Sequence, residues 1–183
     1  MSSIAITGGA TGTGVFSLLA PSTSTNRTLT LPDAAGTVAL QGGAGVGKVL
    51  QVVNAITSTQ TSNSTNTYAD TGLTASITPT SATSKILVLV DVAGVYKLTS
   101  DTACDIKLLR NSTDLITFAK DAGYNGTVAQ NIVGTQSCNY LDSPATTSAT
   151  VYKAQFMSSS NSAAVRVQNG SQTSTITLME IAA

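Results

Sequence analysis

The stretch KILVLVDVAGVY, residues 85–96, decides the fold that this chain of 183 residues is expected to adopt. It contains Ile86–Val90, the longest block of bulky apolar residues in the sequence, in which β-branched residues alternate with leucine. A strand without a polar face is typical of one that is covered on both sides. The stretch therefore predicts the core strand of a β-sandwich or barrel.

Short segments of alternating apolar and polar residues fill the remainder of residues 48–183. About nine or ten of them follow at intervals of roughly 8–12 residues, the spacing typical of a sandwich or jelly roll. The predicted strands cover residues 48–57, 68–71, 72–77, 85–96, 105–110, 115–119, 128–140, 146–157, 163–168 and 175–181. The pattern predicts an all-β fold, a jelly-roll-like β-sandwich.

Two details of this pattern are specific enough to check. Two triplets of alternate residues are each expected to share one face of a strand: Leu73, Ala75 and Ile77, and Tyr152, Ala154 and Phe156. The tract TSTQTSNSTNT, residues 57–67, is expected to be a low-complexity loop because it is built almost wholly of Ser, Thr and Asn.

The charge of the chain is low and balanced. Charged residues make up 10% of it, with 9 basic and 9 acidic residues. Because no basic patch is available for phosphate backbones, nucleic acid is not an expected partner. No run reaches the ~18 apolar residues of a membrane helix, and MSSIAITGG lacks the features of a secretory signal. We therefore expect no membrane insertion, synthesis in a cytoplasm, and free thiols at Cys104 and Cys138, with a disulfide between them as the alternative.

Residues 26–40, NRTLTLPDAAGTVAL, predict a two-stranded unit that cannot be stable alone. Leu29 and Leu31 lie on one face of its first strand, a Pro-Asp-Ala-Ala-Gly turn follows, and Val38 and Leu40 belong to the second strand. A two-stranded unit of this size cannot bury its own leucines. Neighbouring copies of the same chain are the simplest partners to cover them.

Two parts of the sequence resemble known proteins. Residues 12–40, GTGVFSLLAPSTST followed by NRTLTLPDAAGTVAL, resemble a module of bacteriophage tail-fibre and other virion appendage proteins. The blocks GKVLQVV, GLTASITPTSATSKILVLV, YLDSPATTSATVYKAQF and STITLMEIAA resemble a C-terminal domain that recurs in proteins of marine phages, often cyanophages. The resemblance implies a virion-anchoring β stem, intertwined in a trimer, over residues 1–41, a Gly linker over 42–47 and a trimeric β-sandwich knob over 48–183. The trimer stem would be held by Leu29, Leu31, Val38 and Leu40.

The same resemblance implies a non-enzymatic structural protein of the phage virion. The protein would be made in the cytoplasm of the host bacterium and displayed on the virion surface as a homotrimeric fibre or knob, like a tail fibre, for host attachment. Its partners would be its own copies, other virion proteins bound through the N-terminal segment, and a host surface glycan or protein. One face of residues 86–90 would then pack inside the sandwich and the other against a neighbouring copy.

The length of the chain favours an alternative location. At 183 residues, the chain is much shorter than a typical tail fibre. A capsid-bound head fibre, or a capsid decoration protein that stabilises the shell, is therefore the second interpretation.

The residues needed for catalysis are sparse. The chain has no His, the usual general base, and no Ser in a G-x-S-x-G elbow. Its acidic residues are scattered, and it has no Trp to line a sugar cleft, so a glycan depolymerase is only the third interpretation. Asp101 and Asp105 supply too few oxygens for a hard cation. No enzymatic activity, cofactor or metal is therefore expected, and Asp91 is expected to pair with Lys97, Arg110 or a backbone group.

Residues 42–48, GGAGVGK, nearly spell a phosphate-binding loop. Such a loop needs Ser or Thr after the lysine and a helix that begins there, but Val49 follows and starts a predicted strand. The glycines therefore indicate a flexible linker.

The segment DAGYNGT, residues 121–127, contains the best candidate for recognition. Tyr124 and Asn125 offer an exposed aromatic ring and an amide, groups suited to a glycan or another receptor. Binding residues are often carried by loops on a rigid scaffold, and we expect this loop at the end of the knob distal to the stem. An ordinary variable loop is the alternative interpretation.

Overall fold

The computed structural model describes residues 48–126, 131–160 and 163–183. The predicted stem over residues 1–41, with Leu29, Leu31, Val38 and Leu40, lies outside the described residues, as does the predicted linker over 42–47. The described part contains one short 3₁₀ turn, η1 (Asn169–Ser171), no α-helix and ten strands. The strands are β1 (Val49–Thr57), β2 (Thr61–Asn63), β3 (Ala69–Ile77), β4 (Lys85–Lys97), β5 (Cys104–Arg110), β6 (Thr113–Ala122), β7 (Ile132–Asp142), β8 (Thr150–Ser158), β9 (Val165–Val167) and β10 (Ser174–Ile181).

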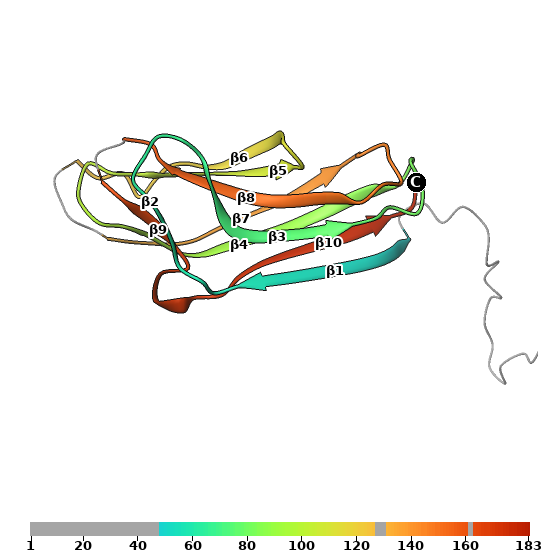
Figure 1. The fold of residues 1–183 in the computed structure, drawn as a ribbon, viewed down its shortest axis with the longest axis horizontal. Coiled ribbons are helices and arrows are strands. Elements are labelled where there is room, and N and C mark those ends of the chain that lie inside the picture. The colour runs from blue at the N-terminus through green and yellow to red at the C-terminus, as the bar shows by residue number, and fades with distance from the viewer. Residues whose placement is uncertain (1–47, 127–130, 161–162) are drawn as a thin grey trace, which may run out of the picture. The chain divides into compact units, whose positions relative to one another are not determined.

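The strands form two antiparallel sheets that stack face to face (Figure 1). In the first sheet, β10 lies between β1 and β4, β7 pairs with the other side of β4, and the short strands β9 and β2 extend the sheet at one end. The second sheet has the order β3-β8-β5-β6. Apart from β2 and β9, the chain changes sheet at every connection except the β5–β6 hairpin, which is the connectivity of a jelly roll. The predicted all-β, jelly-roll-like sandwich is confirmed.

The long strand β4 is the centre of the first sheet, as residues 85–96 predict. Its side chains alternate between the two faces of the sheet: Ile86, Val88 and Val90 are buried in the sandwich, whereas Leu87 and Leu89 are only half-buried on the outer face. One face of residues 86–90 thus packs inside the sandwich, as expected, and the cover expected for the other face, a neighbouring copy, stays a prediction. The sandwich has only two layers, so each sheet is covered on one face alone.

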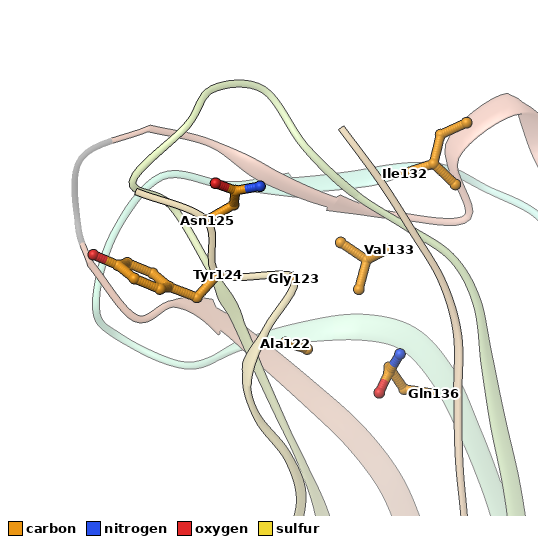
Figure 2. A pocket seen from close by; sticks show the side chains of 7 residues that line it. All are labelled: Ala122, Gly123, Tyr124, Asn125, Ile132, Val133 and Gln136. Atoms are coloured by element: carbon orange, nitrogen blue, oxygen red, sulfur yellow. The ribbon is translucent and has the colours of Figure 1, made fainter. Parts of the chain in front are cut away.

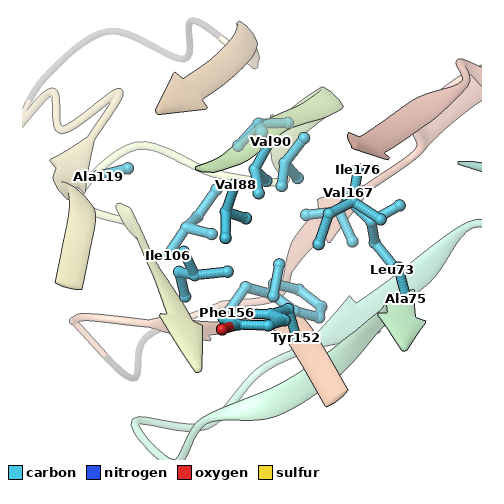
Figure 3. Close-up of a cluster of buried hydrophobic side chains, with 14 of the residues drawn as sticks. Leu73, Ala75, Val88, Val90, Ile106, Ala119, Tyr152, Phe156, Val167 and Ile176 are labelled. Carbon is cyan, nitrogen blue, oxygen red and sulfur yellow. The ribbon is translucent and has the colours of Figure 1, made fainter. Parts of the chain in front are cut away.

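The core lies between the two sheets and is built from alternate residues of both (Figure 3). Tyr152 and Phe156 of β8 point into it and are fully buried. Both predicted triplets are confirmed, because Leu73, Ala75, Ile77, Tyr152, Ala154 and Phe156 are all buried. The strands predicted over residues 105–110 and 115–119 correspond to β5 and β6, which pair antiparallel as a hairpin.

The tract at residues 57–67 is not simply a loop, and that expectation is wrong. It contains β2, which pairs with β9, and it buries Asn63. The Asn63 Nδ2 donates to the carbonyls of Thr67 and Phe156 at 2.9 and 3.0 Å, and its Oδ1 accepts from the backbone N–H and the hydroxyl of Thr65. A polar side chain can thus organise the segment without any apolar periodicity.

A bulge changes the alternation of β4 halfway along the strand. The pairing of β4 with β7 shifts between Val92 and Val95, where Gly94 adopts a φ of +62°. A Cβ on Gly94 would lie 2.6 Å from the backbone N of Asn169, so the close approach of η1 requires glycine. Beyond the bulge, Lys97 is fully buried, and its Nζ has no hydrogen-bond partner among the described residues.

Asp91 does not have the partner that the sequence predicts. It is exposed on the outer face of β4, where it accepts a hydrogen bond of 3.3 Å from the Thr175 hydroxyl. Lys97 lies beyond the bulge, and Arg110 forms an ion pair with Asp142 instead. The prediction failed because Asp91 shares its face with Leu87 and Leu89, the residues that the sandwich leaves partly exposed.

Candidate functional site

The predicted recognition loop lies at the end of the sandwich opposite to the first described residue. Lys48 lies beside the C-terminal end of β10, because its carbonyl accepts a hydrogen bond of 2.9 Å from the N–H of Ala182. That end of the sheet also contains Lys85, the first residue of β4, which pairs with Ile181. Ile132, on the far side of the Tyr124 loop, pairs instead with Tyr96 near the other end of β4.

Tyr124 is held in place by a local hydrogen-bond network. Its hydroxyl donates to Asp101 Oδ1 at 2.8 Å, and the N–H of Asp101 donates to the carbonyl of Asn125 at 2.7 Å. The hydrogen bond to Asp101 and the charge of that carboxylate raise the pKa of Tyr124, so the phenol stays protonated. The turn also uses positive φ angles at Asp121 and Gly123. The ring is therefore fixed in position, with the Tyr124 residue 58% exposed.

A depression of about 340 Å³ lies at this turn, and the Tyr124 ring at its edge points away from Ile132, Val133 and Gln136 (Figure 2). Its lining combines an aromatic ring, two branched apolar side chains and two amides. The lining residues are Ala122, Gly123, Tyr124, Asn125, Ile132, Val133 and Gln136. A mixture of an exposed ring with amide donors and acceptors can bind a polar ligand that also has apolar faces, such as a sugar.

The sequence predicts only two of the residues that line this depression. Tyr124 and Asn125 are both present, and the structure brings them together with Ile132, Val133 and Gln136 of β7. Ile132 is 73% exposed, an unusual position for a large apolar side chain. No signal in the sequence indicates this contact, because it depends on how β7 pairs with β4.

Three buried carboxylates, those of Glu180, Asp142 and Asp105, lie elsewhere in the sandwich, and all have structural partners. Glu180 of β10 accepts hydrogen bonds from Gln51 Nε2 at 2.6 Å and from the N–H and hydroxyl of Thr80 at 2.8 and 2.7 Å. Burial raises the pKa of Glu180, but the hydrogen bonds from Gln51, Thr80 and Ser84 outweigh it and lower the pKa to about 2. Glu180 thereby joins β1, β10 and the β3–β4 connection.

Asp142 connects the two sheets at the end where Glu180 lies, because both residues pair with Ile86 of β4. Both of its carboxylate oxygens lie 2.8 Å from Nη1 of Arg110, and Oδ2 also accepts a hydrogen bond of 2.6 Å from the hydroxyl of Tyr152. Burial, followed by the hydrogen bond to Asp142, raises the pKa of Tyr152. A protonated phenol and a paired carboxylate make this cluster a structural link between β5, β7 and β8.

Other titratable groups in the described residues are dispersed. Nowhere in residues 48–126, 131–160 and 163–183 do three His, Cys, Asp or Glu side chains gather where they could hold a metal ion. Asp105 Oδ1 accepts from the N–H of Asp121 at 2.7 Å, so it belongs to a turn. Cys104 and Cys138 are free, and burial raises their pKa values to about 12 and about 11. Neither thiol is activated as a nucleophile.

Within the described residues, no helix is long and apolar enough to span a membrane.

Comparison with known proteins gives likenesses among solved structures and none among curated proteins or family models. No protein-family model matches this chain, and no curated protein does. A similar solved structure is the crystal structure of the infectious bursal disease virus VP2 subviral particle, with a TM-score of 0.45 and 15% sequence identity. The likeness covers 73% of this chain and 33% of that chain, so this chain spans about a third of the VP2 chain. A likeness this distant does not bear on function.

Proposed function

We propose that this protein is a non-enzymatic structural protein of a bacteriophage virion, which assembles as a homotrimer and presents its sandwich for attachment to the host surface. The stem over residues 1–41 holds the three copies together and anchors them to other virion proteins. The sandwich over residues 48–183 is the knob. The motifs in NRTLTLPDAAGTVAL and in the blocks of the second part support this assignment.

One observation carries the proposal: the chain enters the sandwich at one end, and the best candidate for recognition lies at the other. Lys48 is hydrogen-bonded to Ala182, whereas Tyr124 lies at the far end of β4 with Ile132. The strand β4 spans 13 residues, which is about 40 Å at ~3.3 Å per residue. An anchored sandwich therefore presents the Tyr124 loop away from its attachment point.

Attachment by such a protein depends on repetition rather than on one strong site. The depression beside Tyr124 is shallow and open, with one exposed ring, and such a site binds a single sugar weakly. A trimer carries three copies of the loop, and many trimers are displayed on one particle. Linked weak sites can raise the overall affinity by ~10²–10⁴-fold without any new contact.

The direct test is binding of the purified full chain to host cells. We expect Tyr124→Ala to reduce cell binding by at least about tenfold, because the ring is the largest exposed group of the depression. Tyr124→Phe keeps the ring and removes only the hydroxyl bonded to Asp101, so it should retain most of the binding. Ile116→Ala is the matched control, since this exposed residue lies on β6 outside the depression. Equal binding by Tyr124→Ala and the unmodified chain would remove the loop from the proposal.

The location on the virion needs a separate measurement. Gold-labelled antibody against the chain distinguishes a tail appendage from a head fibre or a decoration protein, because label over the whole head excludes the tail. Incubation with host polysaccharide addresses the depolymerase alternative, and release of reducing ends would overturn the assignment as a non-enzymatic protein.

A further inference from the structure

The two outer faces of the sandwich differ in their chemistry. On the β3-β8-β5-β6 sheet, the outer face contains ion pairs between Lys107 and Asp114 and between Lys153 and Asp70, each with an N–O distance of 2.9 Å. On the outer face of the β1-β10-β4-β7 sheet, the stretch of β4 that pairs with β10 and β7 has only Lys85 and Asp91 as charged residues. The first of these faces is typical of a solvated surface, and the second is not.

An apolar row crosses all four strands of this second face, between the positions of Lys85 and Asp91 on β4. The register places Val52 of β1 beside Met179 of β10, Met179 beside Leu87 of β4, and Leu87 beside Leu141 of β7. Neighbouring strands lie ~4.8 Å apart, so these four side chains form a continuous strip about 14 Å long. Val52 is 56% exposed and Leu141 51% exposed in the single chain.

The two neighbouring rows differ, because one is uncharged and the other contains a single charge. The next row along the strands consists of Asn54, Thr177, Leu89 and Asn139. On the other side lie Leu50, which is 41% exposed, Ile181, and Lys85, which pairs with Ile181. Contiguous exposed apolar surface of this kind marks an interaction site on a soluble protein.

We propose that this face, centred on the row Val52, Met179, Leu87 and Leu141, is the contact between copies of the chain. The inference rests on the proposed function, because it identifies the surface through which the sandwiches of the homotrimer meet. The occupant is a second copy, since 47 residues precede Lys48 and join the sandwich at the end where this row lies. The unit predicted within them needs neighbouring copies to cover its leucines, so those copies arrive at this end of the face.

Rotational symmetry supports the same occupant. If the copies are related by an axis that runs along the strands, each row of one copy meets the same row of its neighbour. The apolar row then contacts an apolar row, and the row with Asn54 and Asn139 contacts amides and hydroxyls that can hydrogen-bond with it. No charged residue is buried in either row.

Cysteine labelling of the assembled full chain tests this surface. Val52→Cys and Leu141→Cys place a thiol in the row, and Ile116→Cys is the control on the other sheet. In the single chain, Ile116 is 37% exposed and thus less accessible than Val52 or Leu141. The native Cys104 and Cys138 give little background at neutral pH, because burial raises their pKa values. Thermal unfolding and light scattering verify that each variant is folded and which mass it has.

The expected result is an oligomer in which Val52→Cys and Leu141→Cys react with a maleimide at least about tenfold more slowly than Ile116→Cys. An oligomer in which both row positions react as fast as Ile116→Cys would overturn the inference and leave the trimeric fibre standing. A monomeric full chain would refute the inference together with the trimer of the proposed function. Two row positions are used so that failure of one variant to fold still leaves a decisive measurement.

Discussion

Replacing Glu180 by glutamine removes the charge at the centre of the network that joins β1, β10 and the β3–β4 connection. The carboxylate is fully buried and accepts hydrogen bonds from Gln51 and Thr80. A glutamine can accept through one atom only, so its NH2 group would face either the amide of Gln51 or the N–H of Thr80, donor against donor. Gln51 cannot simply turn, because the same Nε2 also donates to the carbonyl of Thr78 at 2.7 Å.

The magnitude follows from the lowered pKa of Glu180. Its pKa falls from an ordinary value of 4.5 to about 2 in the folded chain. At ~1.36 kcal/mol per unit of pKa, the ionised carboxylate contributes about 3 kcal/mol to the free energy of unfolding. Because the folded pKa is the lower one, this contribution is present above pH 4.5 and is lost as the pH falls through about 2. We therefore expect Glu180→Gln to be about 3 kcal/mol less stable at pH 7.

Urea unfolding of both proteins between pH 2 and pH 7, followed by circular dichroism, measures this difference. The gap between the unmodified chain and Glu180→Gln should close progressively below pH 4.5, since only the former has this carboxylate to protonate. Other acidic groups titrate in both proteins and cancel. Asp91→Asn, the loss of an exposed carboxylate, should change stability by less than about 0.5 kcal/mol. A gap that is absent at pH 7, or that does not change with pH, would refute the role assigned to Glu180.

Three further substitutions test the packing of the sandwich. Gly94→Ala should lower the free energy of unfolding by about 3 kcal/mol, because its Cβ meets the backbone of Asn169 at a φ of +62°; thermal unfolding unchanged from that of the parent chain would contradict this. Lys97→Met should raise the free energy of unfolding, measured in urea, by ~1–3 kcal/mol, because the substitution removes a fully buried ammonium without a hydrogen-bond partner in the described residues. A loss of stability would show that the ammonium is paired. Tyr152→Phe should cost ~1–2 kcal/mol in the same assay, since Asp142 loses a buried donor at 2.6 Å, and an unaltered midpoint would argue against that hydrogen bond.

Much of the fold could be predicted from the sequence, because a half-buried strand alternates apolar and polar residues with a period of two. The triplet Leu73, Ala75 and Ile77 alternates with polar residues, so its burial follows from local pattern alone. The period does not reveal how many layers a fold has. For that reason the sequence predicts a covered β4, whereas Leu87 and Leu89 lie on an outer face.

Other features depend on geometry that no short pattern encodes. Lys97 is turned inward by the bulge at Gly94, and Asn63 is buried by hydrogen bonds to a distant strand. The candidate site shows the same limit. Tyr124 was predictable as an aromatic residue in a Gly- and Asn-containing loop, but Ile132 joins it only through the pairing of β7 with β4.

The position of β10 has a consequence for how the chain folds during synthesis. This strand follows the other nine described strands in the chain, yet it lies between β1 and β4, and Val49 pairs with Ile181. Until residues 174–181 emerge, β1 has no partner in its sheet and Val88 lacks its neighbour Leu178. Pairing between strands so far apart in sequence is intrinsically slow, because the entropy of closing the intervening loop is lost before any contact between the strands stabilises the chain. The nascent chain must therefore leave β1 and one edge of β4 unpaired until β10 has been made, and loss of β10 would leave them unpaired permanently.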